Sequence, residues 1–150
     1  ETEQLADGIW LVAGGSHNSV VVEFEDYVTV IEAPLDEERS LAVIDELMIL
    51  IPNKPIRFIV NTHHHWEHLG GLRTYVPEGA TVITHEGNRP YYQEVLRARP
   101  WLLEPDRFSL YPPEEWSEGY IFETVREKYT LGDATRLLEL HPVQDRKSVV

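Results

Sequence analysis

The sequence of 150 residues contains no cysteine, and it has no long apolar run. Without cysteine, the chain can form neither disulfide bonds nor thiolate metal sites of its own. A membrane-spanning helix needs roughly 20 consecutive apolar residues, and no segment approaches that length. We therefore expect a soluble protein with no membrane partner. Its compartment stays open: the cytoplasm, or the periplasm or medium if a leader was removed before Glu1.

Basic residues are also scarce. The chain has 13 lysines and arginines against 26 acidic residues, which gives a formal charge of −13. Nucleic acids and anionic membranes are bound through basic patches, so we expect neither as a partner. Apolar residues nevertheless make up 42% of the chain and aromatic residues 10%, which is enough for one domain with a packed core.

Strand and helix patterns alternate along the chain. Segments rich in β-branched and aromatic residues predict strands at 9–13, 19–24, 27–33, 56–60, 80–84, 120–129 and 135–140. Helices are predicted at 36–51, with Asp36 as the N-cap, and at 69–75 and 88–97. The first helix has an apolar stripe that we expect in the core: Leu41, Ile44, Leu47, Met48 and Ile51. The sequence thus predicts an α/β architecture, a mixed central sheet with helices packed on it.

A cluster of histidines follows the predicted strand 56–60. Four of the seven histidines and one carboxylate lie in the stretch His63-His64-His65-Trp66-Glu67-His68. Residues two apart point to the same side of an extended segment, so the first and third histidines can reach one ion. Imidazoles and a carboxylate suit zinc, and also manganese or iron. We interpret four residues as metal ligands for one or two ions: His63, His65, Glu67 and His68.

The same loop can be interpreted as a catalytic site. A catalytic zinc usually has three protein ligands and an open position for water, whose pKa falls to about 7. The resulting hydroxide would be the nucleophile, and Glu67 could orient it, which makes Glu67 the predicted catalytic residue. Neither half of the cluster, His63 with His65 or Glu67 with His68, reaches three ligands from this loop alone.

The pattern His63-x-His65-x-Glu67-His68, between an apolar strand and Gly70-Gly71, resembles the signature of the metallo-β-lactamase superfamily. The resemblance covers roughly residues 5–144. It includes three further segments: Ser16-His17-Asn18-Ser19 before a hairpin, Glu32-Ala33-Pro34 at a strand end, and Thr84-His85-Glu86 after another strand. It implies an αββα metallo-β-lactamase-like fold, truncated to roughly its first half. It also implies a zinc-dependent hydrolase that acts on a small-molecule ester, lactone, thioester, amide or phosphoester.

By that resemblance, His63 and His65 bind a first metal, and Glu67 and His68 bind a second. The family usually has aspartate where this chain has Glu67, and a longer carboxylate shifts the second metal or the bound water. The family takes its remaining ligands, two histidines and a bridging aspartate, from the C-terminal half, and this chain has only His141 beyond residue 85. We therefore expect weak or no activity. The alternative is a non-catalytic metal-binding module that self-associates, for instance as a homodimer through an exposed edge or core surface.

The last six residues, 145–150, break the preceding pattern. They can be encoded by GAT CGG AAG AGC GTC GTG, which is part of a widely used sequencing adapter. Our hypothesis is that residues 1–144 form a partial metallo-β-lactamase-like domain and that residues 145–150 are a translated, non-native tail. Nucleotide reads that continue into genomic sequence with other codons would contradict it.

Several other residues have both a structural and a functional interpretation. Glu32, at a strand end, could lie beneath the metals and orient a ligand. We give a structural role by default to the histidines outside the predicted ligand set: His17, His64, His85 and His141. The aromatic residues of the segment 100–119 could form a substrate lid or pack within their own loop: Trp101, Phe108, Tyr111 and Trp116.

Overall fold

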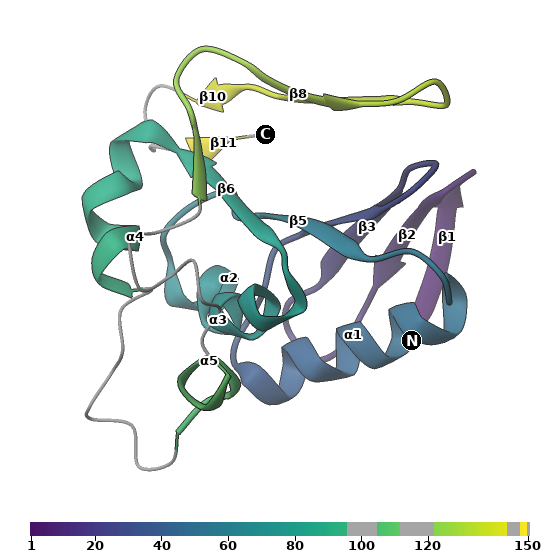
Figure 1. Ribbon diagram of the computed structural model, residues 1–150, viewed down its shortest axis with the longest axis horizontal. Helices are drawn as coiled ribbons and strands as arrows, with labels where there is room; N and C mark the ends of the chain where they lie inside the picture. Colours follow the sequence, from purple (N-terminus) through teal and green to yellow (C-terminus); the bar gives the residue numbers. More distant parts are fainter. Residues whose placement is uncertain (96–104, 112–121, 144–147, 150) are drawn as a thin grey trace.

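The computed structural model describes residues 1–95, 105–111, 122–143 and 148–149. A mixed sheet of seven strands forms its centre, and the order of the strands in the sheet is their order in the chain (Figure 1). These strands are β1 (Thr2–Ala6), β2 (Ile9–Val12), β3 (Ser19–Glu23), β4 (Val28–Ile31), β5 (Ile56–Val60), β6 (Thr81–His85) and β7 (Phe122–Val125). Neighbours from β1 to β4 are antiparallel, and those from β4 to β7 are parallel. The predicted mixed sheet is confirmed.

Helices pack on one face of this sheet (Figure 1). They are α1 (Glu37–Leu50), α2 (Trp66–Leu69), α3 (Leu72–Tyr75), α4 (Arg89–Val95) and α5 (Arg107–Leu110). The helix α1 begins where the sequence predicts, because the side chain of Asp36 accepts a hydrogen bond from the backbone N–H of Arg39 at 2.9 Å. In the described part of the chain, no helix is both long enough and apolar enough to cross a membrane.

Two hairpins cover the opposite face (Figure 1). They are formed by β8 (Tyr129–Gly132) with β9 (Leu137–Leu140), and by β10 (Pro142–Val143) with β11 (Ser148–Val149). Each central strand therefore sends alternate side chains into two separate hydrophobic clusters. On β5, for example, Ile59 joins the cluster under the helices and Val60 joins the cluster under the hairpins. The strands at the centre of the sheet are thus buried on both faces.

The prediction that Met48 belongs to the core is wrong. Its side chain is 59% exposed, whereas Val43, Ile44 and Leu47 are buried against the sheet. Successive helical residues are rotated by about 100°, and Met48 therefore lies at the solvent side of the buried line. It lines a surface cavity of about 410 Å³ together with Pro52.

The predicted helix 69–75 is in fact two short helices, α2 and α3, on either side of Gly70 and Gly71. Both glycines approach the start of α1 closely. A methyl group added at Gly70 would collide with the backbone carbonyl oxygen of Leu35, and one added at Gly71 would collide with that of Asp36. The strand β1 was not predicted, because its sequence TEQLA is mostly polar and exposed.

Candidate metal centre

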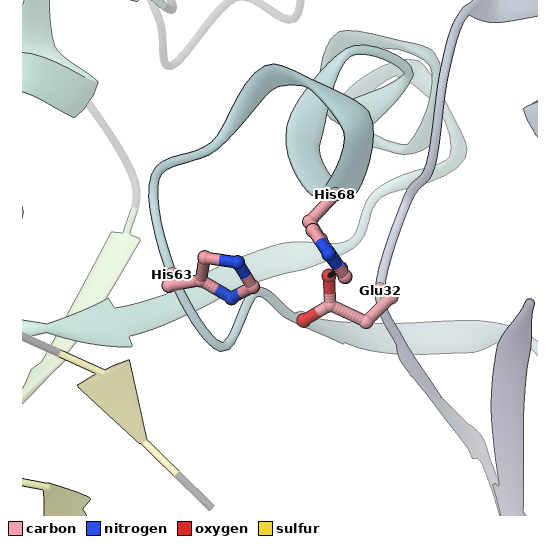
Figure 2. Close-up of side chains that lie close together, drawn as sticks. All are labelled: Glu32, His63 and His68. Carbon is pink, nitrogen blue, oxygen red and sulfur yellow. Dashed lines mark hydrogen bonds and ion pairs between the residues drawn. The ribbon is translucent and has the colours of Figure 1, made fainter. Parts of the chain in front are cut away.

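The candidate centre lies where the parallel strands β4 and β5 end. Glu32 directly follows β4, and the histidine-rich loop directly follows β5. Because the carboxyl ends of parallel strands meet at one edge of a sheet, these segments become neighbours. Figure 2 shows the result: Glu32, His63 and His68 point toward one another, with ligand atoms that all lie within 4.8 Å of each other.

Glu32 reaches the loop from an unusual backbone conformation. Its φ of 72° lies in the left-handed region, which costs roughly 1–2 kcal/mol for a residue with a side chain. The surrounding structure fixes this conformation, because the backbone N–H of Glu32 donates to the carbonyl oxygen of Val60 at 2.8 Å. The hydroxyl of Ser19 donates to the carbonyl oxygen of Glu32 at 2.9 Å. Strain of this kind is concentrated at functional sites.

Hydrogen bonds orient both histidine rings. The Nδ1 atom of His68 lies 2.7 Å from Oε2 of Glu32, whose Oε1 accepts a hydrogen bond from the backbone N–H of Thr62, also at 2.7 Å. The Nδ1 atom of His63 lies 2.8 Å from the hydroxyl of Thr62. The Nε2 atom of each ring is thus the one that can bind a metal. Metal-binding histidines commonly have such a carboxylate on their other nitrogen, and these residues fit a divalent cation.

The electrostatics of the site favour the metal-binding forms of the histidines. Burial, and then the neighbouring His68, lower the pKa of His63. Burial and the nearby His17 likewise lower the pKa of His68. Neutral imidazole is the form that binds metals, so these rings can accept a cation at neutral pH with little competition from protons. Glu32 is only 9% exposed, and burial raises the pKa of its carboxyl group against the opposing hydrogen bonds from Thr62.

The structure places the other two predicted ligands at the solvent side of the loop. The ring of His65 is exposed and lies 4.8 Å from the ring of His63, measured between centroids. Its Nδ1 atom is 3.7 Å from Oε1 of Glu67. The rings that lie closest are those of His63 and His68, with centroids 4.1 Å apart. The assignment of His65 and Glu67 as ligands stays a prediction, and the contact between Glu32 and His68 agrees with the interpretation of Glu32 as an acid that orients a ligand.

Backbone hydrogen bonds fix the loop after β5 to the loop after β4. The carbonyl oxygen of His68 accepts from Ala33 at 3.1 Å, and that of Glu67 accepts from Leu35 at 3.2 Å. The backbone N–H of Gly71 donates in turn to Ala33 at 3.0 Å. Leu35 has a left-handed backbone too, with a φ of 67°. The loop after β4, which supports the candidate centre, therefore contains two residues with a left-handed backbone within four positions.

The remaining histidines differ in their distance from the centre. His17 lies beside it, with its ring centroid 5.1 Å from that of His68. The side chain of His85 accepts a hydrogen bond from a backbone amide two residues further on, and His64 is exposed and contacts Tyr91. His141 is exposed and lies 3.3 Å from a glutamate of β9. Among the described residues, none of these four joins the group of Glu32, His63 and His68.

Two buried residues with polar groups at the site, Asn61 and Tyr92, are not among those that the sequence predicts. Asn61 could have been recognised in the sequence because its amide side chain directly follows the apolar strand β5. Of the predicted lid, Phe108 is buried beneath the guanidinium of Arg73, and Tyr111 is exposed. The two tryptophans, at positions 101 and 116, lie outside the described residues, and the lid stays a prediction.

Comparisons with known proteins agree with this architecture. The profile of the metallo-β-lactamase superfamily matches residues 12–145. A linear primary-alkylsulfatase from a Pseudomonas species is 32% identical over 76 residues, which cover 50% of this chain and 11% of that protein. A metallo-β-lactamase structure from Cronobacter sakazakii has a TM-score of 0.68 and 20% identity, over 99% of this chain and 58% of that one. A metallo-β-lactamase structure from Novosphingobium pentaromativorans has a TM-score of 0.70 and 16% identity, over 99% of this chain and 53% of that one.

The chain spans about half the length of these solved structures and a much smaller part of the alkylsulfatase. At such low identity, the structural likeness shows the fold alone. The superfamily profile, by contrast, matches most of the chain, including both loops that form the candidate centre. The chain belongs to the metallo-β-lactamase superfamily.

Proposed function

We propose that this chain is the metal-binding part of a zinc-dependent hydrolase that acts on a small-molecule ester, lactone, thioester, amide or phosphoester. The observation that supports it is the arrangement of Glu32, His63 and His68. Both rings have Nδ1 in a hydrogen bond and Nε2 available, and a buried carboxylate orients one of them. Membership of the superfamily supports the same proposal. Manganese or iron would suit the same nitrogen and oxygen ligands.

Each residue would have a distinct role. His63 and His68 would hold the cation, with His65 and Glu67 as further ligands from the solvent side, for one ion or two. A bound cation would polarise the scissile group and activate water as the nucleophile. The pKa of Glu67 is lowered by a hydrogen bond from the backbone amide of Glu67 itself and by the neighbouring His65. At neutral pH this carboxylate is therefore ionised and can orient the attacking water.

Metal binding by the chain is the first test. We expect the 150-residue chain to bind zinc, and we expect His63→Ala and His68→Ala to weaken binding strongly. His141→Ala is the matched control, because it removes an exposed imidazole that lies outside the group. A wild-type chain without measurable zinc affinity would contradict the proposal. Loss of affinity in the control would instead identify His141 as a ligand.

Turnover is the second test. A panel of the five substrate classes, with a sulfate ester added because of the alkylsulfatase relative, should show weak or no hydrolysis by this chain. The reason is that the chain spans only about half the length of the solved structures. Robust turnover without a partner chain would contradict this expectation. Stoichiometric zinc binding together with dimers in size-exclusion chromatography, and no turnover, would favour the non-catalytic module.

A further inference from the structure

The side chain of Asn61 joins the two ends of the histidine-rich loop. Asn61 is the first residue after β5, it is fully buried, and its backbone N–H donates to the carbonyl oxygen of Ile83 at 2.9 Å. Its side-chain Nδ2 donates to the carbonyl oxygen of His68 at 2.8 Å. The same nitrogen lies 3.5 Å from Oε2 of Glu32. One amide thus closes the loop and also contacts the carboxylate that orients His68.

Tyr92, on α4, binds the oxygen end of this amide. Its side chain is fully buried, and its hydroxyl donates a hydrogen bond to Oδ1 of Asn61. An amide can donate only from its nitrogen and accept only at its oxygen. With the opposite orientation, Oδ1 would face the carbonyl oxygen of His68 and Nδ2 would face the tyrosine hydroxyl. Because the carbonyl oxygen of His68 and the carboxylate of Glu32 can only accept, they keep Nδ2 on their side, and the hydroxyl of Tyr92 holds Oδ1 on the opposite side.

The same hydroxyl lies 3.4 Å from the carbonyl oxygen of His63, a residue 29 positions earlier in the chain. Tyr92 thus faces the backbone of one candidate ligand directly and that of the other, His68, through Asn61. We propose that Tyr92 is a positioning residue of the metal centre, which acts through Asn61 to keep the imidazoles of His63 and His68 facing each other. This inference rests on the proposed metal-dependent function.

The test uses Tyr92→Phe, which removes the hydroxyl and keeps the buried ring. Zinc and cobalt(II) are titrated separately into the full 150-residue chain. Groups behind metal ligands typically contribute about 10- to 100-fold to affinity, and we expect about 10-fold weaker binding because Tyr92 acts through a second residue. The visible absorption of bound cobalt(II) should change as well, since it reports ligand geometry. A merely structural hydroxyl would leave that spectrum unchanged.

Tyr75→Phe is the matched control. Tyr75 is also fully buried, but it lies on α3 beside Ser40 of α1 and outside the loop of the metal centre. We expect the metal affinity of Tyr75→Phe to stay within about twofold of wild type, whatever the effect of this substitution on thermal unfolding. Equal affinity losses in both variants would overturn the proposal. A Tyr92→Phe chain that does not fold would overturn it too, because the hydroxyl would then be a requirement for folding.

The route through Asn61 is tested with the double variant. If Tyr92 acts through Asn61, Tyr92→Phe should weaken binding by less than about twofold in an Asn61→Ala background. Two independent losses that multiply would overturn this route, and if the double variant does not fold, the comparison with Tyr75→Phe decides alone. A wild-type chain that binds neither cation contradicts the proposed function itself. A wild-type chain that binds, with Tyr92→Phe unchanged, overturns only the role of Tyr92.

Discussion

Replacing Glu32 by glutamine should weaken metal binding while it leaves the stability of the fold nearly unchanged. The carboxylate of Glu32 has three hydrogen-bonding partners, which are the backbone N–H of Thr62, Nδ1 of His68 and, at 3.5 Å, Nδ2 of Asn61. Glutamine has only one acceptor oxygen, so its NH₂ group must face one of these donors. Glu32→Gln therefore loses a hydrogen bond either to the His68 ring or to the backbone of the loop, and either loss weakens the support of that ring.

The two effects of this substitution differ in size. Loss of such a partner typically weakens metal affinity about 10- to 100-fold, which corresponds to roughly 1.4–2.7 kcal/mol. The free energy of unfolding should change by less than about 1 kcal/mol, because two terms oppose each other. The lost hydrogen bond costs about 1–2 kcal/mol. The neutral amide also avoids the cost of burying a carboxylate that is only 9% exposed.

Zinc titration against a chelating dye would measure the affinity, and urea denaturation would measure stability. Glu23→Gln is the control, since Glu23 ends β3 and forms an ion pair with Lys54 at 2.7 Å. It should leave zinc affinity unchanged. If Glu32→Gln bound zinc as tightly as wild type, the carboxylate would not orient a ligand and the reasoning would be refuted.

Three further substitutions test the fold around the site. Gly70→Ala should lower the free energy of unfolding by about 2–3 kcal/mol, because its methyl group would meet the carbonyl oxygen of Leu35; equal stability in urea would contradict this contact. Asp106→Asn should cost about 1–2 kcal/mol at pH 7, because buried Arg73 would then face a neutral amide. Burial raises the pKa of Asp106, but the hydrogen bonds from Arg73 outweigh it and lower this pKa to about 2. The wild-type chain should therefore be more stable than Asp106→Asn above about pH 4, and this difference in stability should vanish as the pH falls toward 2. A stability difference that does not depend on pH would refute this ion pair. Val149→Ala should cost about 1–2 kcal/mol in thermal unfolding, because Val149 is fully enclosed in the cluster beneath the hairpins, and an unchanged melting temperature would argue against that packing.

Features set by neighbouring residues could be predicted from the sequence. The bounds of β5 were predicted exactly, because an apolar run lies between Pro55 and the polar Asn61. The start of α1 was predicted because Asp36 caps it within three residues. The histidine cluster was recognised for the same reason, since its spacing is a local property. The exposure of Met48 could not be predicted, because the packing of the helix on the sheet decides which of its sides is buried.

Features that join distant segments could not be predicted in the same way. The hydrogen bond between Glu32 and His68 spans 36 positions, and that between Tyr92 and Asn61 spans 31. The left-handed backbone of Glu32 also has no local signal, because glutamate rarely adopts it and no glycine marks the site. The sequence alone therefore supports both a structural and a ligand-orienting role for Glu32.

The order of the strands bears on how the protein folds as it is synthesised. From β1 to β6, every strand pairs with the strand made immediately before it, so the sheet can grow in step with the emerging chain. Contacts between segments close in sequence form quickly, and translation presents the N-terminal part first. The residues that hold the candidate centre, from Glu32 to Tyr92, all belong to this early part. The contacts among these residues can therefore form before the segments beyond α4 have emerged, and the hydrogen bond from the backbone N–H of Val149 to the carbonyl oxygen of Thr62 follows later.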